Sequence, residues 1–517
     1  MRDKQIVLRF KGQLDTTVLN VWQGAGVRGR LIEIPGGDVN CPTNRDHKEP
    51  AWFAAADLAV SRNRNLLGME NLLFVSLFVI YGLVAIPIFA LLTPAFQVGD
   101  EIAHFLRADQ VALGQLIGKR AGPTQSGGVV DQSISDSFNL FYPIIQHPER
   151  KETTSILRKA STIGWNKVKS FRQFENTSIY PPFYYMVSAF AIRIGKLANL
   201  SVSRTLKLSR LMNGVTAILL GAVALGLAGS AAPWFFALLT LPMTLFQMAS
   251  ASQDALLIPM AAVAAALFVR LLRQESHHRI EFGLLCVLLG LIGMGRVSYV
   301  ALALLPLALS RPSLRARLAG CTIAAAAGLG WAWIAWRIAL VPFGLPGADA
   351  PAQIHYLIAH PSSIIPLIVN TMRYQWDLYV ESFVGKLGWL DLSLPHSYIV
   401  IAIFDLVMAA LASFTVVAGW KNTLHQKMIV LFAMAASIGI LFAALYISWS
   451  PVGDFIVGGV QGRYFIPLAF FLAALFSARS SRRPRATILV CRSMVAAFPL
   501  ITIPIVLVGI VSRYYLS

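Results

Sequence analysis

Long apolar runs recur along the chain from Leu72 onward, and they constrain its fold more than any other feature. Crossing the roughly 30 Å hydrocarbon core of a bilayer takes about 20 helical residues. Clear runs of this kind lie at 71–93, 211–229, 318–341, 397–419, 428–449 and 487–511. Weaker or shorter candidates lie at 182–199, 234–249, 255–272, 282–295, 297–309 and 463–478. Because backbone polar groups in lipid must be paired within their own segment, the pattern predicts an all-α, polytopic transmembrane bundle.

The composition excludes two broad classes of protein. Hydrophobic residues make up 56% of the chain and charged residues only 13%, whereas soluble proteins carry about 25% charged residues. The 44 Lys and Arg residues outnumber the 25 Asp and Glu residues, but they stand in short clusters rather than on one continuous face. We therefore expect neither a soluble enzyme nor a nucleic-acid partner. The four cysteines have no spacing typical of a metal site or a disulfide framework.

Lys and Arg in short loops mark the cytoplasmic side of a membrane protein. The clusters that we assign to this side contain Arg204, Lys207 and Arg210; Arg270, Arg273 and Arg279; Arg311, Arg315 and Arg317; Lys421 and Lys427; and Arg479, Arg482, Arg483 and Arg485. They share one side if 282–309 is a hairpin turning at Arg296 and if 234–249 folds back without crossing. This arrangement predicts about eleven spans, within a range of ten to thirteen, and a cytoplasmic N-terminus. The alternative makes 234–249 a span and 282–309 one long helix.

The predicted orientation divides the chain into an extension and a membrane domain. Residues 69–517 form the membrane domain, and its loops 94–180, 342–396 and 450–462 face outward, the first carrying amphipathic helices. Residues 1–68 contain no apolar segment typical of a secretory signal. We expect them to be a poorly ordered cytoplasmic extension or the product of a misassigned start.

The stretch from Pro94 to Arg107 carries the strongest candidates for catalysis. Asp100 and His104 are four residues apart and so share a helix face, with Glu101 one step around. A carboxylate where a membrane helix meets an outer loop is partly desolvated, which raises its pKa toward the working range of a general base. Alternatively, the two acids only stabilise the first turn of a helix. An Asp and a His supply two metal ligands, fewer than a metal site needs, so no metal site is assigned here.

Two arginines near the outer ends of apolar runs are candidates for binding phosphate. Arg296 stands between two apolar runs, and an arginine within a membrane usually faces a partner or a watery cavity. Arg463 opens the run at 463–478, between Gln461 and Tyr464. Guanidinium groups match phosphate oxygens two at a time. For Arg463, snorkelling to the membrane interface remains the alternative.

Further candidates for substrate binding are acids near the predicted outer mouth. Asp254 lies there if 234–249 re-enters, although a helix cap explains it equally well. Glu381 and Asp391 flank aromatic residues, as on a sugar-binding surface or on an interfacial helix. The sequence has no phosphate-binding loop of the Walker A type, no dinucleotide fingerprint, no H-E-x-x-H and no nucleophile elbow. Chemistry driven by a cytoplasmic nucleotide is therefore not expected.

Several motifs resemble a bacterial family of predicted multi-span membrane proteins of unknown function, often met among genes for surface polysaccharides. In chain order they are Pro94 to His104, Tyr180-Pro181-Pro182, Leu241-Pro242 through Asp254, Phe383 to Asp391, and Gln461 to Phe465. The resemblance covers about 70–512. The outline is also similar to the GT-C superfamily of glycosyltransferases, in which an acidic motif on the first outer loop serves catalysis. Gly99 departs from the proline expected before the acidic pair.

The GT-C resemblance implies an inverting glycosyltransferase in the bacterial cytoplasmic membrane. It would move a sugar from a polyprenyl-phosphate donor to an envelope glycan, lipid or protein on the extracytoplasmic side. Asp100 or Glu101 would be the base, and Arg296 and Arg463 would bind the phosphate, while His104, Gln461 and Tyr464 lie in the same motifs. No cofactor is implied, although Asp254, Glu381 or Asp391 could hold a divalent ion. The alternatives are a lipid-linked sugar transporter and an accessory subunit of a polysaccharide assembly complex.

Overall fold

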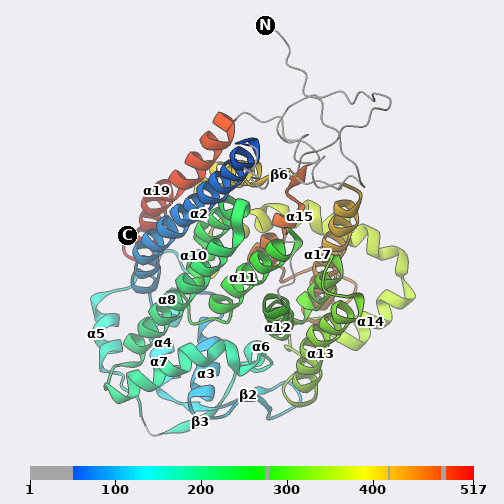
Figure 1. The fold of residues 1–517 in the computed structure, drawn as a ribbon. Coiled ribbons are helices and arrows are strands. Elements are labelled where there is room, and N and C mark those ends of the chain that lie inside the picture. The colour runs from blue at the N-terminus through cyan, green and yellow to red at the C-terminus, as the bar shows by residue number, and fades with distance from the viewer. Residues whose placement is uncertain (1–50, 167, 274–278, 417–419, 479–484, 517) are drawn as a thin grey trace, which may run out of the picture.

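The computed structural model describes residues 51–166, 168–273, 279–416, 420–478 and 485–516. Its architecture is all-α apart from short strands (Figure 1). Residues 1–50 of the expected N-terminal extension lie outside the described residues. Residues 51–68 of that extension belong to helix α2 (Ala51–Leu92).

The described part of the chain contains 7 helices that are long and apolar enough to cross a membrane. They are Asn71–Leu92, Val202–Thr240, Asp254–Arg273, Leu314–Ile338, His396–Ser413, Leu424–Ser448 and Ala486–Tyr514. A pair of helices bent by 96°, Ala350–Ala359 and Pro361–Val384, raises the number of candidates to 8. The predicted class, a polytopic helical membrane protein, is thereby confirmed, whereas the number of eleven spans stays a prediction.

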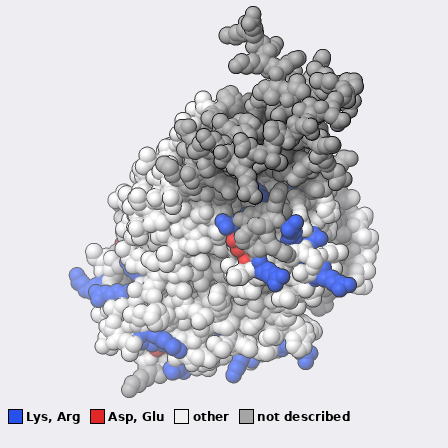
Figure 2. Space-filling model, in the orientation of Figure 1, with Lys and Arg blue, Asp and Glu red and all other residues white. Residues whose placement is uncertain are grey.

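Helix α11 (Asp254–Arg273) forms the centre of the bundle. The most apolar stretch of α11 is 83% buried inside the protein. That of Leu314–Ile338 is only 22% buried, so this helix presents apolar side chains outward. The run of alanine and valine from Ala261 to Ala266 keeps α11 thin, so that its neighbours approach closely. Most of the described surface in Figure 2 lacks charged residues, as a lipid-facing surface requires.

The start of helix α8 (Val202–Ala228) corrects one expectation about the orientation. The amide of Val202 donates to the carbonyl of Ile163, and Arg210 donates to the carbonyl of Pro94. These contacts place the cluster around Arg210 at the end of the bundle where α2 finishes, here called the loop end. The assignment of this cluster to the side opposite the loop 94–180 was therefore wrong. Helix α7 (Met186–Leu197) packs on the loop helix α3 at the same end and does not run through the bundle.

The segment 234–249 runs between the two ends of the bundle, contrary to the expectation that it folds back without crossing. It forms helices α9 (Ala232–Thr240) and α10 (Pro242–Met248), with a break where Pro242 begins the second helix. The amide of Trp234 donates to Ser413, at the far end of α16 (His396–Ser413). The amide of Ala251 reaches Glu101 at the loop end.

The chain reverses direction at Arg296, as the sequence predicts. Helix α12 (Arg279–Gly295) ends there, because the backbone of Arg296 is extended, with φ −150° and ψ 110°. The following 3-10 helix η4 (Val297–Ala308) packs back on α12, since a Cβ built on Gly293 would lie 3.6 Å from the Cα of Val300. In one straight helix these residues would be two turns, or about 11 Å, apart.

The loop 94–180 folds into a layer at the loop end, seen at the bottom of Figure 1. Its elements are α3 (Glu101–Ala112), β1 (Lys119–Arg120), β2 (Ser126–Asp131), α4 (Ser133–Phe141), η1 (Tyr142–Ile144), α5 (Thr154–Thr162), β3 (Lys169–Gln173) and α6 (Glu175–Ser178). The strands form an antiparallel sheet in the order β1-β2-β3, with Val129 opposite Phe171. The 3-10 helix η2 (Pro182–Tyr185) leads from this layer into α7.

The C-terminal half adds the remaining helices around α11. Between α8 and α9 lies η3 (Gly229–Ala231). The other elements are α13 (Leu314–Ile338), α14 (Ala350–Ala359), η5 (Pro361–Ser363), α15 (Ile364–Val384), β4 (Lys386–Leu387), β5 (Leu392–Ser393), β6 (Thr415–Val416), α17 (Trp420–Ser448), η6 (Gly462–Phe465), α18 (Ile466–Ala469), η7 (Phe470–Leu475), β7 (Ser477–Ala478) and α19 (Arg485–Tyr514). Strands β4 and β5 pair antiparallel, and β6 and β7 pair parallel.

Gly462 fixes the position of η6 against α15, and its replacement tests this packing. A Cβ at this position would overlap the carbonyl oxygen of Tyr379 and the amide nitrogen of Phe383. We expect Gly462→Ala to destabilise the protein by about 1–3 kcal/mol, because the two backbones must move apart. Gly439→Ala in α17 is the control, since its Cβ would meet nothing within 4 Å. Thermal unfolding in one detergent compares the two, and equal melting temperatures would contradict the assigned packing.

Candidate functional site

Asp100 is held at the loop end by the tightly packed turn between α2 and α3. It precedes the first residue of α3 and has a left-handed backbone, with φ 62° and ψ 5°. Phe96 is fully buried in the same turn, in edge contact with Phe105 and Phe141, and its carbonyl accepts a hydrogen bond of 3.0 Å from the indole of Trp389. The turn therefore has a single packed arrangement, and the direction of the Asp100 side chain follows from it.

The carboxylate of Asp100 faces Arg463 across the bundle end. The Nη2 atom of Arg463 lies 3.5 Å from Oδ2 of Asp100, and its Nη1 atom lies 3.5 Å from Oε1 of Gln247. The amide of Asn176 donates to the other oxygen of Asp100 at 3.3 Å. The Asp100 side chain is 39% exposed, whereas that of Arg463 is 8% exposed. The ion pair thus has a long contact distance, and solvent reaches it through the carboxylate of Asp100.

A second ion pair adjoins the first. The Nη2 atom of Arg296 lies 3.4 Å from Oδ1 of Asp254, and its Nη1 atom donates to the hydroxyl of Tyr299 at 3.0 Å. The guanidinium also lies 4.2 Å from the ring centroid of Tyr464, a cation–π contact. The hydroxyl of Tyr299 donates to the backbone carbonyl of Tyr464 at 2.7 Å. We define the site cluster as Asp100, Gln247, Asp254, Arg296, Arg463 and Tyr464.

His104 lies beside the site cluster, one turn of α3 after Asp100. Its Nδ1 is 2.8 Å from the hydroxyl of Tyr185, and its ring stacks on Tyr180. Burial lowers the pKa of His104 to about 4, and the charges of Asp100 and Asp254 offset this only in part. The imidazole is therefore neutral near pH 7.

Glu101 has a different environment from its neighbour Asp100. Both its carboxylate oxygens bind Arg210, at 2.8 and 2.6 Å, and both side chains are fully buried. Arg210 also donates to the carbonyls of Ala90, Thr93 and Pro94, at 3.1, 2.6 and 2.9 Å. The amide of Ala251 donates to Glu101 at 3.2 Å. The carboxylate of Glu101 is fully engaged in holding these segments together.

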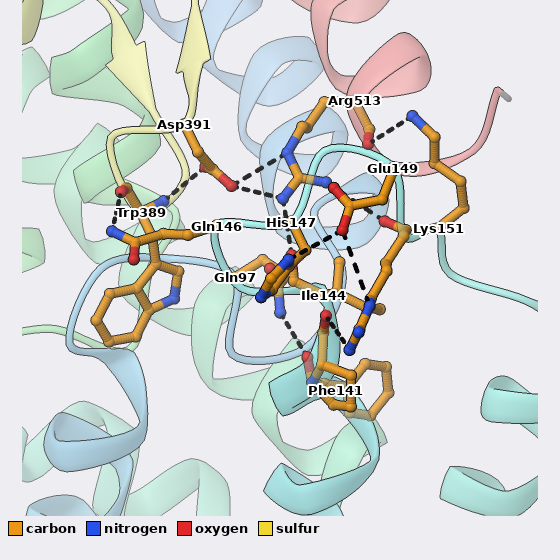
Figure 3. A network of polar contacts seen from close by, with 12 residues as sticks. Gln97, Phe141, Ile144, Gln146, His147, Glu149, Lys151, Trp389, Asp391 and Arg513 are labelled. Atoms are coloured by element: carbon orange, nitrogen blue, oxygen red, sulfur yellow. Dashed lines mark hydrogen bonds and ion pairs between the residues drawn. The ribbon is translucent and has the colours of Figure 1, made fainter.

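Three other residues predicted from the sequence, Glu381, Asp391 and Gln461, lie outside the site cluster. Glu381 pairs with Lys386 at 2.9 Å. Asp391 pairs with Arg513 at 2.5 Å and accepts from the amide of Trp389 at 3.0 Å (Figure 3). Gln461 is half-buried just before η6, where its backbone carbonyl accepts from the amide of Tyr464 at 3.1 Å.

The contacts around Asp391 connect the C-terminus to the loop layer. Arg513 also donates to the carbonyl of Ile144 at 2.8 Å, and Lys151 donates to the carbonyl of Ser512 at 2.8 Å (Figure 3). The amide of Gln146 donates to the carbonyl of Trp389 at 3.4 Å. This network joins the end of α19, the β4–β5 hairpin and the loop layer, so its role is to hold these elements together.

The structure adds residues that the sequence analysis did not single out. Gln247 and Asn176 contact the ion pair of Asp100 and Arg463 directly. The side-chain oxygen and nitrogen of Gln253 and the Nε atom of Arg463 are buried and make no hydrogen bond with the described residues. Two glutamines within seven residues of Asp254, in an apolar region, were the available signal. Among the described residues, no group of three His, Cys, Asp or Glu side chains is placed to hold a metal ion.

The buried pair of Glu101 and Arg210 can be tested through stability. Arg210→Met leaves a buried carboxylate without its partner, and we expect a loss of about 3–5 kcal/mol in the free energy of unfolding. The double variant Glu101→Gln with Arg210→Met should lose less than the sum of the two single losses. Asp100→Asn, at a partly exposed position, should change stability by no more than about 1 kcal/mol. Chemical unfolding in mixed micelles measures all four, and additive losses would contradict the coupling.

The neutral state of His104 predicts a pH dependence of stability. Its pKa is about 4 in the folded protein and 6.5 without burial, so between these values the unfolded chain binds a proton that the folded protein does not. Stability therefore falls as the pH decreases from 6.5 toward 4. His104→Gln should remove this part of the pH dependence, measured as melting temperature against pH. Identical slopes for the variant and the native protein would show that His104 is not buried as a neutral base.

Comparison with known proteins identifies the family. The sequence model of a family described as "Predicted membrane protein (DUF2142)" matches residues 83–472. Comparisons with curated proteins and with solved structures found no match. The matched region covers well over half of the chain and contains every residue of the site cluster. The chain therefore belongs to DUF2142, a family of predicted membrane proteins.

Proposed function

We propose that the protein is a membrane glycosyltransferase of the bacterial cytoplasmic membrane. It transfers a sugar from a polyprenyl-phosphate donor to an acceptor of the cell envelope, on the extracytoplasmic side. The observation that carries the proposal is the site cluster, where a partly exposed carboxylate, Asp100, lies 3.5 Å from one guanidinium and a second guanidinium, Arg296, lies beside it. Such a reaction needs a base for the acceptor and cations for the departing phosphate.

Asp100 rather than Glu101 is the base in this proposal. A general base must come within hydrogen-bond distance of the hydroxyl that it deprotonates. Glu101 is fully buried and bound at both oxygens to Arg210. Asp100 is 39% exposed, and its two contacts are as long as 3.3 and 3.5 Å. An acceptor hydroxyl can therefore reach Asp100 without breaking a strong pair.

Arg463 and Arg296 bind the donor phosphate. Each is held in place by one carboxylate at 3.4 to 3.5 Å, so guanidinium donors remain for phosphate oxygens. Asp100 takes the proton of the acceptor hydroxyl, whose oxygen attacks the anomeric carbon. The bond from that carbon to the phosphate oxygen breaks, and the arginines stabilise the charge that develops on the leaving phosphate. Attack from the side opposite the leaving group inverts the anomeric configuration.

We propose a topology of about eleven spans with a cytoplasmic N-terminus. In chain order the spans are α2, α8, the broken pair α9 and α10, α11, α12, η4, α13, α16, α17, the run from η6 to η7, and α19. In this order the basic clusters after α11, η4, α16 and η7 share the cytoplasmic side. The cluster at Arg210 is outside, where Glu101 neutralises the arginine.

A lipid-linked sugar transporter is the second candidate, because of one residue in the middle of a span. Asp405 lies halfway along α16, is 5% exposed, and makes no hydrogen bond or ion pair with other described residues. A carboxylate at this depth is costly and often marks a path for ions or substrate. It is distant in sequence from every element that forms the site cluster.

The transferase is tested with the purified protein in proteoliposomes and a panel of polyprenyl-phosphate sugars. We expect release of polyprenyl phosphate, and we expect Asp100→Asn to lower kcat by about 10²–10⁴-fold, because the base is lost. Arg463→Gln and Arg296→Gln should raise the KM for the donor more than the corresponding lysine variants do, because lysine keeps the charge. Glu281→Gln, which removes the partner of Arg270 at the opposite end, is the matched control.

Two outcomes would contradict this proposal. Turnover that is unchanged in a folded Asp100→Asn protein would exclude Asp100 as the base. If no donor is consumed but a lipid-linked sugar crosses the bilayer, and Asp405→Asn stops the crossing, the protein is a transporter.

A further inference from the structure

An open groove of about 640 Å³ lies in the loop layer, beside the site cluster and distinct from it. It is lined by Ile102, Ala103 and Leu106 of α3 and by residues of α4 and of strand β3. Its volume falls within the range of about 300–1,000 Å³ that is typical of ligand sites.

The lining of the groove is polar and carries no excess of charge. The polar side chains are Gln125, Ser135, Asp136, Asn139, Arg172 and Gln173. One acid and one base cancel, so neither a phosphate nor a polyanion is favoured. The remaining amides and the hydroxyl both donate and accept hydrogen bonds, as the hydroxyl groups of a sugar do.

These polar groups are available for a ligand. In the part of the chain that the structure describes, the side chains of Gln125, Asp136, Asn139 and Gln173 make no hydrogen bond with another residue. Phe138 and the 37% exposed Phe171 add aromatic rings to the lining. A ring beside amides suits a sugar, which has an apolar face of C–H groups and an edge of hydroxyls.

Two of the groove's elements lead directly to Asp100. Ile102, which lines the groove, is two residues after Asp100 on the same chain segment. Gln173, also in the lining, is followed by α6, whose Asn176 donates to Asp100 at 3.3 Å. Two chain segments thus connect the lining of the groove to the proposed base.

We infer that this groove binds an uncharged oligosaccharide, which is the acceptor, and that it directs a terminal hydroxyl toward Asp100. The role as acceptor rests on the proposed function, whereas binding of the glycan does not. Amides hold the hydroxyls, and Phe171 packs on a sugar ring.

The binding is measured by calorimetry with the full chain in lipid nanodiscs. The probes are hexasaccharides of α-glucan, β-glucan, mannan and chitin, together with oligogalacturonate as an acidic probe. At least one neutral probe should bind, and oligogalacturonate should bind at least about tenfold more weakly. Phe171→Ala and the pair Asn139→Ala with Gln173→Ala should each weaken binding by about tenfold or more. Lys169→Ala, an exposed change on the same strand, is the control.

The possible results separate this inference from the proposed function. No binding of any neutral probe, or equal binding by the groove variants and the native protein, overturns the groove. If the native protein binds a neutral glycan in the groove but transfers no sugar, glycan binding is supported and the proposed transferase is contradicted. If the protein transfers sugar but the groove variants do not change the KM for the acceptor, the transferase is supported and the groove is not the acceptor site.

Discussion

The buried ion pair between Glu101 and Arg210 is the interaction on which the arrangement of the site depends. Removing two charges from water is costly, and the cost is offset only when their hydrogen-bonding groups are satisfied. Every guanidinium nitrogen of Arg210 that carries hydrogen donates to Glu101 or to a carbonyl at the end of α2. The pair therefore joins α2, α3 and α8 at one point, and Ala251 adds the segment that leads to α11.

Two neighbouring acids consequently have different roles. Glu101 is anchored inside the protein, and the left-handed backbone of Asp100 turns its own side chain toward Arg463. A conformation with positive φ is unfavourable for aspartate by itself, and it persists because the packing of Phe96 and the ion pair of Glu101 fix both flanks. The exposed carboxylate is thus oriented by its buried neighbour.

Much of this arrangement follows from the sequence, because charges in apolar runs are rare and costly. That rule identified Asp100, Arg296 and Arg463, and the structure brings them into one cluster. A different rule, that Lys and Arg in short loops mark the cytoplasmic side, failed for Arg210, because counting basic residues cannot distinguish a cytoplasmic charge from one that a buried acid neutralises. It also failed for 234–249, where Pro242 divides the run into two helices too short to read as a span. Asn176 reaches the site only through the folding of a distant segment, which no local pattern reveals.

The position of the site cluster explains how a lipid donor and a hydrophilic acceptor could meet under the proposed function. Arg463 and Arg296 lie at the ends of apolar segments, η6 and α12, so a phosphate bound there keeps its hydrocarbon chain among the helices. Asp100 lies where the loop layer begins, and the groove lies in that layer rather than in the bundle. The two substrates then need no shared path. Under the proposed function they would meet beside the ion pair of Asp100 and Arg463, whose Oδ2 and Nη2 atoms lie 3.5 Å apart.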